Sequence, residues 1–216
     1  MSSTAPERPR RPSAWMSAPE NIHPEFHRFL GRADKEGLLG QKGLVVWMYG
    51  LSGSGKSTIA NLVERHLHES GRFTVILDGD NLRSGLNNNL GFSDEDRFEN
   101  IRRNAEVAKL FAQQGIITLV SMITPRRALR ARARETIGED YLEVFVRADY
   151  ATCARRDPKG LYAKAEAGTL KQFTGKDSGF EEPEDGEANL ILDTNRQSAE
   201  ECAQRLVGLI TAHTSP

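Results

Sequence analysis

A glycine-rich segment that ends in lysine and serine lies between an apolar run and a segment with helical spacing. Gly50 to Ser57 reads Gly-Leu-Ser-Gly-Ser-Gly-Lys-Ser, after an apolar run at 44–49 and before a helical pattern that begins at Thr58. Glycines at this spacing let backbone N–H groups point at phosphate oxygens, and the positive end of the following helix adds to the field. This is a Walker A loop in sequence and context, which indicates a nucleoside triphosphate site. The residues expected to cradle the phosphates are Gly50, Leu51, Ser52, Gly53, Ser54, Gly55, Lys56, Ser57 and Thr58.

Side chains in and near this loop are suited to phosphoryl transfer. We expect Lys56 to bridge the outer phosphates and the Ser57 hydroxyl to ligate Mg²⁺. An apolar run at 73–77 is followed by Asp78 and Asp80, at the edge of the sheet where ligands of open α/β folds bind. The sequence Asp-Gly-Asp-Asn also favours a simple turn, so these two carboxylates alone leave both interpretations open.

An aromatic ring and several arginines follow the two aspartates. Phe92 is centred in Gly-Phe-Ser, and Arg97 and Asn100 share one face of a helix that Ser93 or Asp94 could cap. A ring for stacking, guanidinium groups for acidic groups and an amide suit a second, anionic substrate that carries a base. The competing interpretation is a solvated helix whose arginines pair with neighbouring carboxylates. The arginines are Arg83, Arg97, Arg102 and Arg103, and the alternative partners are Glu95, Asp96 and Glu99.

Short apolar runs alternate with segments of helical spacing along the chain. Nearly continuous apolar strands in such alternation indicate an α/β fold with a mainly parallel, doubly wound, five-stranded sheet that has helices on both faces. The segment 157–189 interrupts the alternation and is too long for a simple connection, so we expect a lid there. The predicted strands are 44–49, 73–77, 116–120, 141–146 and 190–192. The clearest helices are 58–70 and 198–212, and Ser198 with Glu201 forms a capping box at the start of the second.

Composition limits the classes of function. The 216 residues suit one domain, which we expect at 21–216 after a disordered tail at 1–20. With 29 basic and 30 acidic side chains the net charge is −1, so nucleic acid is not an expected partner despite the arginines at 126–134, of which 126, 130 and 134 form one helix face. No segment reaches the roughly 20 apolar residues that cross a bilayer, so we expect no membrane partner. Cys153 and Cys202 match no metal spacing and suit free thiols in a reducing cytoplasm.

An ordered set of further motifs extends the glycine-rich loop. Together they resemble the adenylyl-sulfate kinase family over about residues 21–195, and the set is far more specific than a Walker loop alone. The motifs are GLSGSGKSTIA at 50–60, LDGDNLR at 77–83, GLN at 85–87, LGFS at 90–93, DR at 96–97, ENIRR at 99–103, EVA at 106–108, RDPKGLY at 156–162 and FTG at 173–175, with LGQKG at 39–43 before the first strand.

The resemblance implies a P-loop kinase that transfers the γ-phosphoryl group of ATP to the ribose 3′-hydroxyl of adenosine 5′-phosphosulfate (APS). The products would be 3′-phosphoadenosine 5′-phosphosulfate (PAPS) and ADP, in the second step of sulfate activation. It also implies Mg²⁺ and a homodimer, and it admits association with a sulfate adenylyltransferase. Asp80 would orient or deprotonate the acceptor hydroxyl, while Asp78 would support the metal through water. The implied APS pocket comprises Arg83, Phe92, Arg97, Asn100, Ile123, Lys159 and Phe173, and Arg155 and Arg156 would flank the other nucleotide.

The chain departs from the family pattern in two places. Where the family usually has Phe-Ile-Ser-Pro, this chain has Met-Ile-Thr-Pro at 122–125, and Thr124 keeps the hydroxyl of a serine associated with a phosphorylated enzyme form. Thr124 is therefore a candidate phosphoacceptor. The expected lid has Ala163 for a usual Lys, Glu166 for Arg, Lys176 for Ile and Phe180 for Tyr, changes expected to alter acceptor affinity or lid closure.

Two other functions stay open on the sequence. The first is a P-loop kinase that phosphorylates another small nucleotide or a sugar. The second is a non-catalytic ATP-binding subunit of a sulfate-activating complex, which would bind ATP without forming ADP.

Overall fold

The computed structural model describes residues 21, 23, 25, 28–169, 173–175 and 179–215. The chain divides into two units, Met1–Gly31 and Arg32–Pro216, and every element named below belongs to the second. The tail expected at 1–20 lies outside the described residues. Among the helices of the described part of the chain, none has the length and apolar character of a membrane span.

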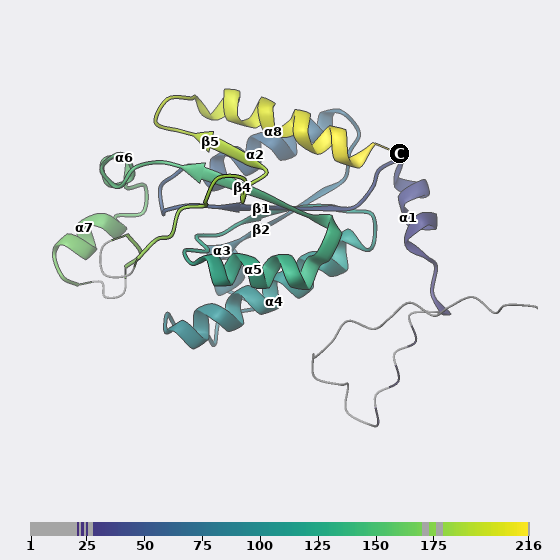
Figure 1. Ribbon diagram of the computed structural model, residues 1–216, viewed down its shortest axis with the longest axis horizontal. Helices are drawn as coiled ribbons and strands as arrows, with labels where there is room; N and C mark the ends of the chain where they lie inside the picture. Colours follow the sequence, from purple (N-terminus) through teal and green to yellow (C-terminus); the bar gives the residue numbers. More distant parts are fainter. Residues whose placement is uncertain are drawn as a thin grey trace, which may run out of the picture. The chain divides into compact units, whose positions relative to one another are not determined.

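The second unit is built on a five-stranded parallel sheet (Figure 1). All five predicted strands are confirmed to within one residue, because each is an apolar run buried between two layers of helices. The strand order is β2-β3-β1-β4-β5, so β1 is central. The strands are β1 (Leu44–Tyr49), β2 (Thr74–Asp78), β3 (Ile117–Ser121), β4 (Tyr141–Arg147) and β5 (Leu190–Asp193).

Helices cover both faces of the sheet, as predicted for a doubly wound fold (Figure 1). Residues that alternate along β1 divide between the faces: Val46 and Met48 pack with α2 and α8, whereas Val45 and Trp47 pack with α4 and α5. The four helices are α2 (Lys56–Glu69), α8 (Ala199–Thr214), α4 (Asp94–Ala112) and α5 (Arg127–Ile137).

Shorter helices complete the unit. A small third cluster, separate from the two main cores, joins α6 and α7 to Phe173 through Cys153, Tyr162 and Ala165. The segment predicted as a lid therefore contains a helix and shares this small core with α6. Cys153 and Cys202 are both buried free thiols, as predicted. The shorter helices are α1 (Arg32–Leu39), α3 (Gly79–Arg83), η2 (Gly138–Asp140), α6 (Tyr150–Arg156) and α7 (Leu161–Glu166).

Candidate active site

The glycine-rich loop joins the carboxyl end of the central strand β1 to the start of α2. Gly50 has φ 151°, and a Cβ there would lie 2.3 Å from the Val146 carbonyl oxygen, so glycine alone fits. Gly55 caps α2 with φ 104°, again a conformation that favours glycine. The glycine-rich turn therefore lies beside the first backbone N–H groups of the 14-residue helix α2. The N–H groups of the turn and of the helix start together form an anion-binding site.

Lys56 is buried at the start of α2 and folds back on the loop. Its Nζ donates to the carbonyl oxygens of Gly50 (2.9 Å) and Leu51 (2.7 Å). Burial lowers the pKa of Lys56 to about 8. Since negative phosphates favour the charged form of a lysine, a bound triphosphate would raise this pKa again.

That difference in pKa predicts proton uptake when a nucleoside triphosphate binds. Near pH 7 Lys56 is already charged and uptake is small, whereas near pH 9 the free protein has lost this proton and the complex regains it. Calorimetry in two buffers of different ionisation enthalpy measures the number of protons. Lys56→Arg, which stays charged at both pH values, should lose this difference. Uptake that does not rise between the two pH values in the unmodified protein would contradict the prediction.

Three oxygen-bearing side chains meet at the start of α2. The Ser57 hydroxyl donates to Asp78 Oδ2 (2.6 Å) and lies 3.2 Å from Ser121 Oγ. Burial opposes ionisation of Asp78, but the Ser57 hydroxyl and two backbone N–H groups outweigh it and hold the Asp78 pKa below its ordinary value. Among the described residues no group of three or more His, Cys, Asp or Glu could hold a metal. The donor set fits Mg²⁺, which takes one or two protein oxygens and completes its shell with phosphate and water.

Two adjoining cavities open beside the loop. The larger, of about 800 Å³, is lined by the glycine-rich loop, by the ends of β2 and β3 and by residues after α6. The smaller, of about 110 Å³, lies among α3, α4 and the segment 122–125. The residues that line both are Gly79, Asp80, Phe92, Arg97, Met122 and Ile123. Asp80 thus faces both spaces.

The aromatic and basic residues predicted from the sequence gather around the smaller cavity. The Arg83 guanidinium carbon lies 4.4 Å from the centre of the Phe92 ring, and that of Arg97 lies 5.8 Å from it. Phe92 itself is 56% exposed, so its ring is available to a ligand. Burial lowers the pKa of both arginines, and the neighbouring Arg83 charge lowers that of Arg97 further. An anionic ligand would relieve this repulsion.

Asn100 and Ile123 complete the wall of the smaller cavity. Asn100 is 4% exposed, and its Oδ1 accepts no hydrogen bond from the residues that the structure describes. A buried amide oxygen without a donor is costly, so it favours a ligand that brings an N–H or O–H group. The alternative interpretation, in which arginines of this helix pair with neighbouring carboxylates, is correct for two other arginines of α4. Arg102 and Arg103 both contact the carboxylate of Glu99 (2.7 and 2.8 Å).

Lys159 and Phe173 line the larger cavity together with Phe92. The Lys159 ammonium pairs with the Asp80 carboxylate, which connects the segment after α6 with the one after β2. Phe173 is largely buried, with its ring edge-on to Tyr162 at 4.8 Å between centres. The two phenylalanines predicted to hold a base thus border one space.

The two arginines predicted to flank a nucleotide have different positions. Arg156 donates to the Thr194 carbonyl (2.6 Å) and to Gly53 O (3.4 Å), and it lines the larger cavity. Arg155 instead donates to Thr152 Oγ1 (3.1 Å), and within the described part of the chain it lines neither cavity.

Several residues at the site were not predicted. Thr194 Oγ1 donates to Ser54 O (2.9 Å) and the Tyr162 hydroxyl donates to Ser52 O (2.7 Å), so both hold the glycine-rich loop from outside. Ser121 is the last residue of β3, at the carboxyl edge of the sheet, and this position at a strand end could have identified it as a site residue from the sequence. Gln197 and Ser198 line the larger cavity from the start of α8, where the sequence had indicated only a helix cap.

Thr124, the candidate phosphoacceptor, lies in the wall of the smaller cavity. It is 2% exposed, and its hydroxyl accepts a hydrogen bond from Trp47 Nε1 (3.0 Å). Of the substituted residues in the expected lid, Ala163 and Glu166 lie on the exposed side of α7, and Phe180 stacks on Phe145 at 5.9 Å between ring centres. Lys176 lies outside the described residues.

Comparisons with known proteins agree with this geometry. Residues 42–193 match the adenylylsulphate kinase family. The adenylyl-sulfate kinase of Phocaeicola vulgatus is 55% identical over 192 residues, which are 88% of this chain and 93% of that protein. The bifunctional enzyme NodQ of Azospirillum brasilense is 53% identical over 82% of this chain, which corresponds to 28% of its own length. The solved APS kinase CysC of Mycobacterium tuberculosis, in complex with AMPPNP and APS, is 49% identical with a TM-score of 0.74 and covers 78% of this chain and 97% of its own.

Proposed function

This chain belongs to the adenylyl-sulfate kinase family, and on that premise we propose how its residues divide the work of phosphoryl transfer. The protein phosphorylates APS with ATP as the donor, giving PAPS and ADP. The observation that carries the proposal is the junction of the two cavities at Asp80. A triphosphate on the glycine-rich loop and a nucleotide against Phe92 would meet there end to end, as in-line transfer requires.

The donor side neutralises charge. Lys56 moves from the loop carbonyls to the outer phosphates, and the surrounding N–H groups hold the remaining oxygens. Ser57 and Asp78, which are hydrogen-bonded to each other (2.6 Å), would hold Mg²⁺, and the ion would supply charge stabilisation for the phosphates. Arg156 fixes the far side of the loop through Thr194 and Gly53.

The acceptor side orients one hydroxyl. Asp80 accepts the proton of the 3′-hydroxyl. The Lys159 ammonium, which pairs with the Asp80 carboxylate, balances the negative charge of that carboxylate. The adenine ring lies between Phe92 and Phe173, while Arg83, Arg97, Asn100 and Ile123 contact the phosphosulfate end or the base. Thr124 as a phosphoacceptor remains a prediction, and its buried hydroxyl would first have to leave Trp47.

The deciding experiment is an assay of the purified protein with ATP, Mg²⁺ and APS, with PAPS identified by mass spectrometry and ADP release followed in parallel. A panel of other nucleotides and sugar alcohols serves as the control. We expect turnover with APS and none above background with the panel. Turnover with another acceptor but not with APS would favour the other small-molecule kinase, and ATP binding without ADP formation would favour the non-catalytic subunit.

Arg97→Ala is expected to weaken acceptor binding while leaving donor binding unchanged. Arg97 Nε donates to Phe92 O (3.0 Å), and its guanidinium lies over that ring, which we propose to hold the acceptor. The loss of one charge-assisted contact predicts a rise of about 10- to 100-fold in KM for APS. Steady-state kinetics with each substrate varied in turn checks it. A similar rise in KM for ATP would contradict the assignment, and Arg102→Ala, on the same helix but bound to Glu99, is the matched control.

Assembly and location complete the proposal. We propose a homodimer, which light scattering would test, and association with a sulfate adenylyltransferase; in the bifunctional enzyme NodQ the matching segment is 28% of a longer chain, so a segment of this kind does occur joined to a second one. The buried free thiols support a reducing cytoplasm. We also propose that 21–216 is the functional domain and that 157–189 is its lid, because Lys159 and Phe173 from this segment line the larger cavity.

A further inference from the structure

The backbone of Thr124 is in an unfavourable conformation. Among the described residues Thr124 is the one non-glycine residue whose φ lies between +20° and +160°, at 40°. For a β-branched side chain this region is strongly disfavoured, so surrounding contacts must impose it. Thr124 and its neighbour Pro125 line the smaller cavity and not the larger one. What imposes this conformation therefore shapes the acceptor side of the site.

Two buried hydrogen bonds fix Thr124 from opposite directions. Trp47 Nε1 donates to its hydroxyl (3.0 Å), and Arg130 Nη1 donates to its carbonyl oxygen (3.3 Å). The flanking carbonyls are also held: Gly50 N donates to Ile123 O (3.3 Å). Of these donors, Arg130 alone carries a charge, and it comes from α5 rather than from the sheet.

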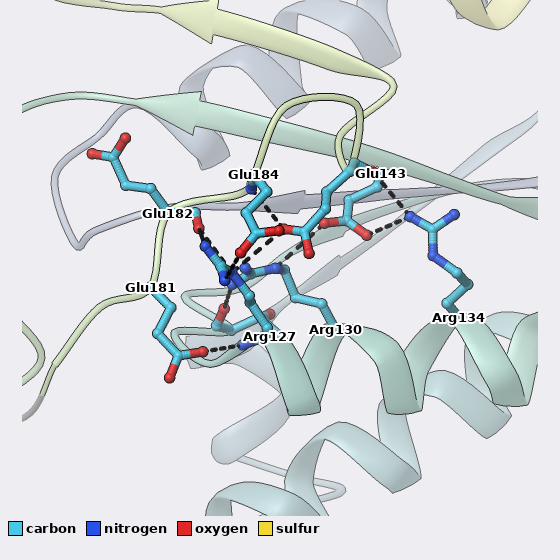
Figure 2. A network of polar contacts seen from close by, with 9 residues as sticks. Arg127, Arg130, Arg134, Glu143, Glu181, Glu182 and Glu184 are labelled. Atoms are coloured by element: carbon cyan, nitrogen blue, oxygen red, sulfur yellow. Dashed lines mark hydrogen bonds and ion pairs between the residues drawn. The ribbon is translucent and has the colours of Figure 1, made fainter.

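Arg130 is itself held by a buried carboxylate (Figure 2). Its Nε lies 3.3 Å from Glu143 Oε1 on β4, both side chains are 3% exposed, and its guanidinium carbon lies 4.5 Å from the centre of the Tyr49 ring. Figure 2 shows Arg130 and Arg134 reaching from α5 toward the same carboxylate. The arginine run expected to form a simple helix face is thus in part a buried ion pair, because Glu143 lies opposite it across the layer.

The same helix also holds the segment 181–187, which we call the acidic segment. The backbone N–H of Arg127 donates to Glu181 Oε2 (2.7 Å), and its guanidinium contacts Glu182 O (3.1 Å) and the Glu184 carboxylate (Figure 2). Glu181 N in turn donates to Pro125 O (2.8 Å). The start of α5 therefore fixes the Thr124 segment on one side and the end of the expected lid on the other.

We propose that Arg130, held by Glu143, is a positioning residue for the acceptor. By binding the Thr124 carbonyl it keeps Ile123, Thr124 and Pro125 in the wall of the smaller cavity, and so it sets the affinity for the acceptor while leaving the donor loop unchanged. The inference rests on the proposed function of that cavity as the APS site. Neither Arg130 nor Glu143 lines either of the two cavities described above, so they act through the Thr124 segment.

Arg130→Lys tests the proposal with Arg134→Lys as the matched control. Lysine keeps the charge opposite Glu143 but loses the planar fork, in which two separate nitrogens, Nε and Nη1, reach the carboxylate and the Thr124 carbonyl. Arg134 contacts the same carboxylate (2.8 Å) at 46% exposure, and it donates to Glu187 O (3.1 Å) rather than to Thr124. We expect Arg130→Lys to raise KM for APS about tenfold, with KM for ATP and kcat within about twofold, and Arg134→Lys to leave all three within about twofold.

A double variant separates positioning from stability. Arg130→Met with Glu143→Gln removes both buried charges, a change that is often neutral for folding, so Tm should stay near that of the unmodified protein while KM for APS stays raised. Recovery of KM for APS along with Tm would overturn the proposal, as would a parallel rise in KM for ATP in Arg130→Lys. If the unmodified protein itself fails to phosphorylate APS, the proposed function fails. If it succeeds and Arg130→Lys keeps its KM, the inference alone fails.

Discussion

Lys56→Ala is expected to lower kcat by about 10²- to 10³-fold, the effect of removing one preorganised charge from a site where negative charge develops. The ammonium lies among the carbonyls of the glycine-rich loop, within the larger cavity and away from the smaller one. KM for APS should therefore change little. Single-turnover kinetics at saturating ATP separates the chemical step from donor binding.

A measurement of Tm distinguishes a loss of catalysis from partial unfolding in Lys56→Ala. Burial disfavours the charged form of Lys56, so replacing it with alanine removes an unfavourable term, and Tm should be maintained or raised. Lys164→Ala is the control, because Lys164 is exposed on α7 and loses the same charge outside both cavities. A fall in kcat of less than tenfold, or a fall that follows a lower Tm, would contradict the role given to Lys56.

Asp80→Asn is expected to lower kcat by about 10²- to 10³-fold with little change in KM for ATP, because asparagine keeps the shape but cannot accept a proton. Asp80 is the second residue of α3, which follows β2 directly, and it lines both cavities. The Asp80 backbone N–H donates to Asp78 Oδ1 (3.1 Å), a bond that the substitution leaves in place. Rapid-quench measurement of PAPS formation reports the chemical step.

Lys159→Gln shows whether the lower kcat of Asp80→Asn comes from the missing base or from the broken ion pair with Lys159. If Asp80 serves only as the partner of Lys159, removing either side of the pair should reduce kcat equally. If Asp80 takes the proton of the acceptor, Lys159→Gln should be several times milder than Asp80→Asn. Equal effects would leave Asp80 as a structural residue and contradict its assignment as the base.

The strands and the main helices could be predicted because their signals are local. A strand buried on both faces requires a nearly continuous apolar run, and each of the five runs became a strand. Periodic apolar residues predicted α2 and α8, and the capping box at Ser198 is present with both of its hydrogen bonds. The arginines of α5 showed the limit of this reasoning, since spacing identified a helix face but gave no sign that Glu143 would be opposite Arg130.

By itself the sequence determined the phosphate loop, because a strand end, a glycine turn and a helix start that are consecutive in the chain fix that geometry through their own backbone. Only the tertiary structure decided which space adjoins the loop, and it did so by bringing Asp80, Phe92, Ile123 and Lys159 together from four separate segments. It also decided the conformation of Thr124, which depends on donors 77 and 6 residues away in the chain. Such contacts follow from strand order and layer packing, and neither composition nor periodicity encodes which distant side chains will meet.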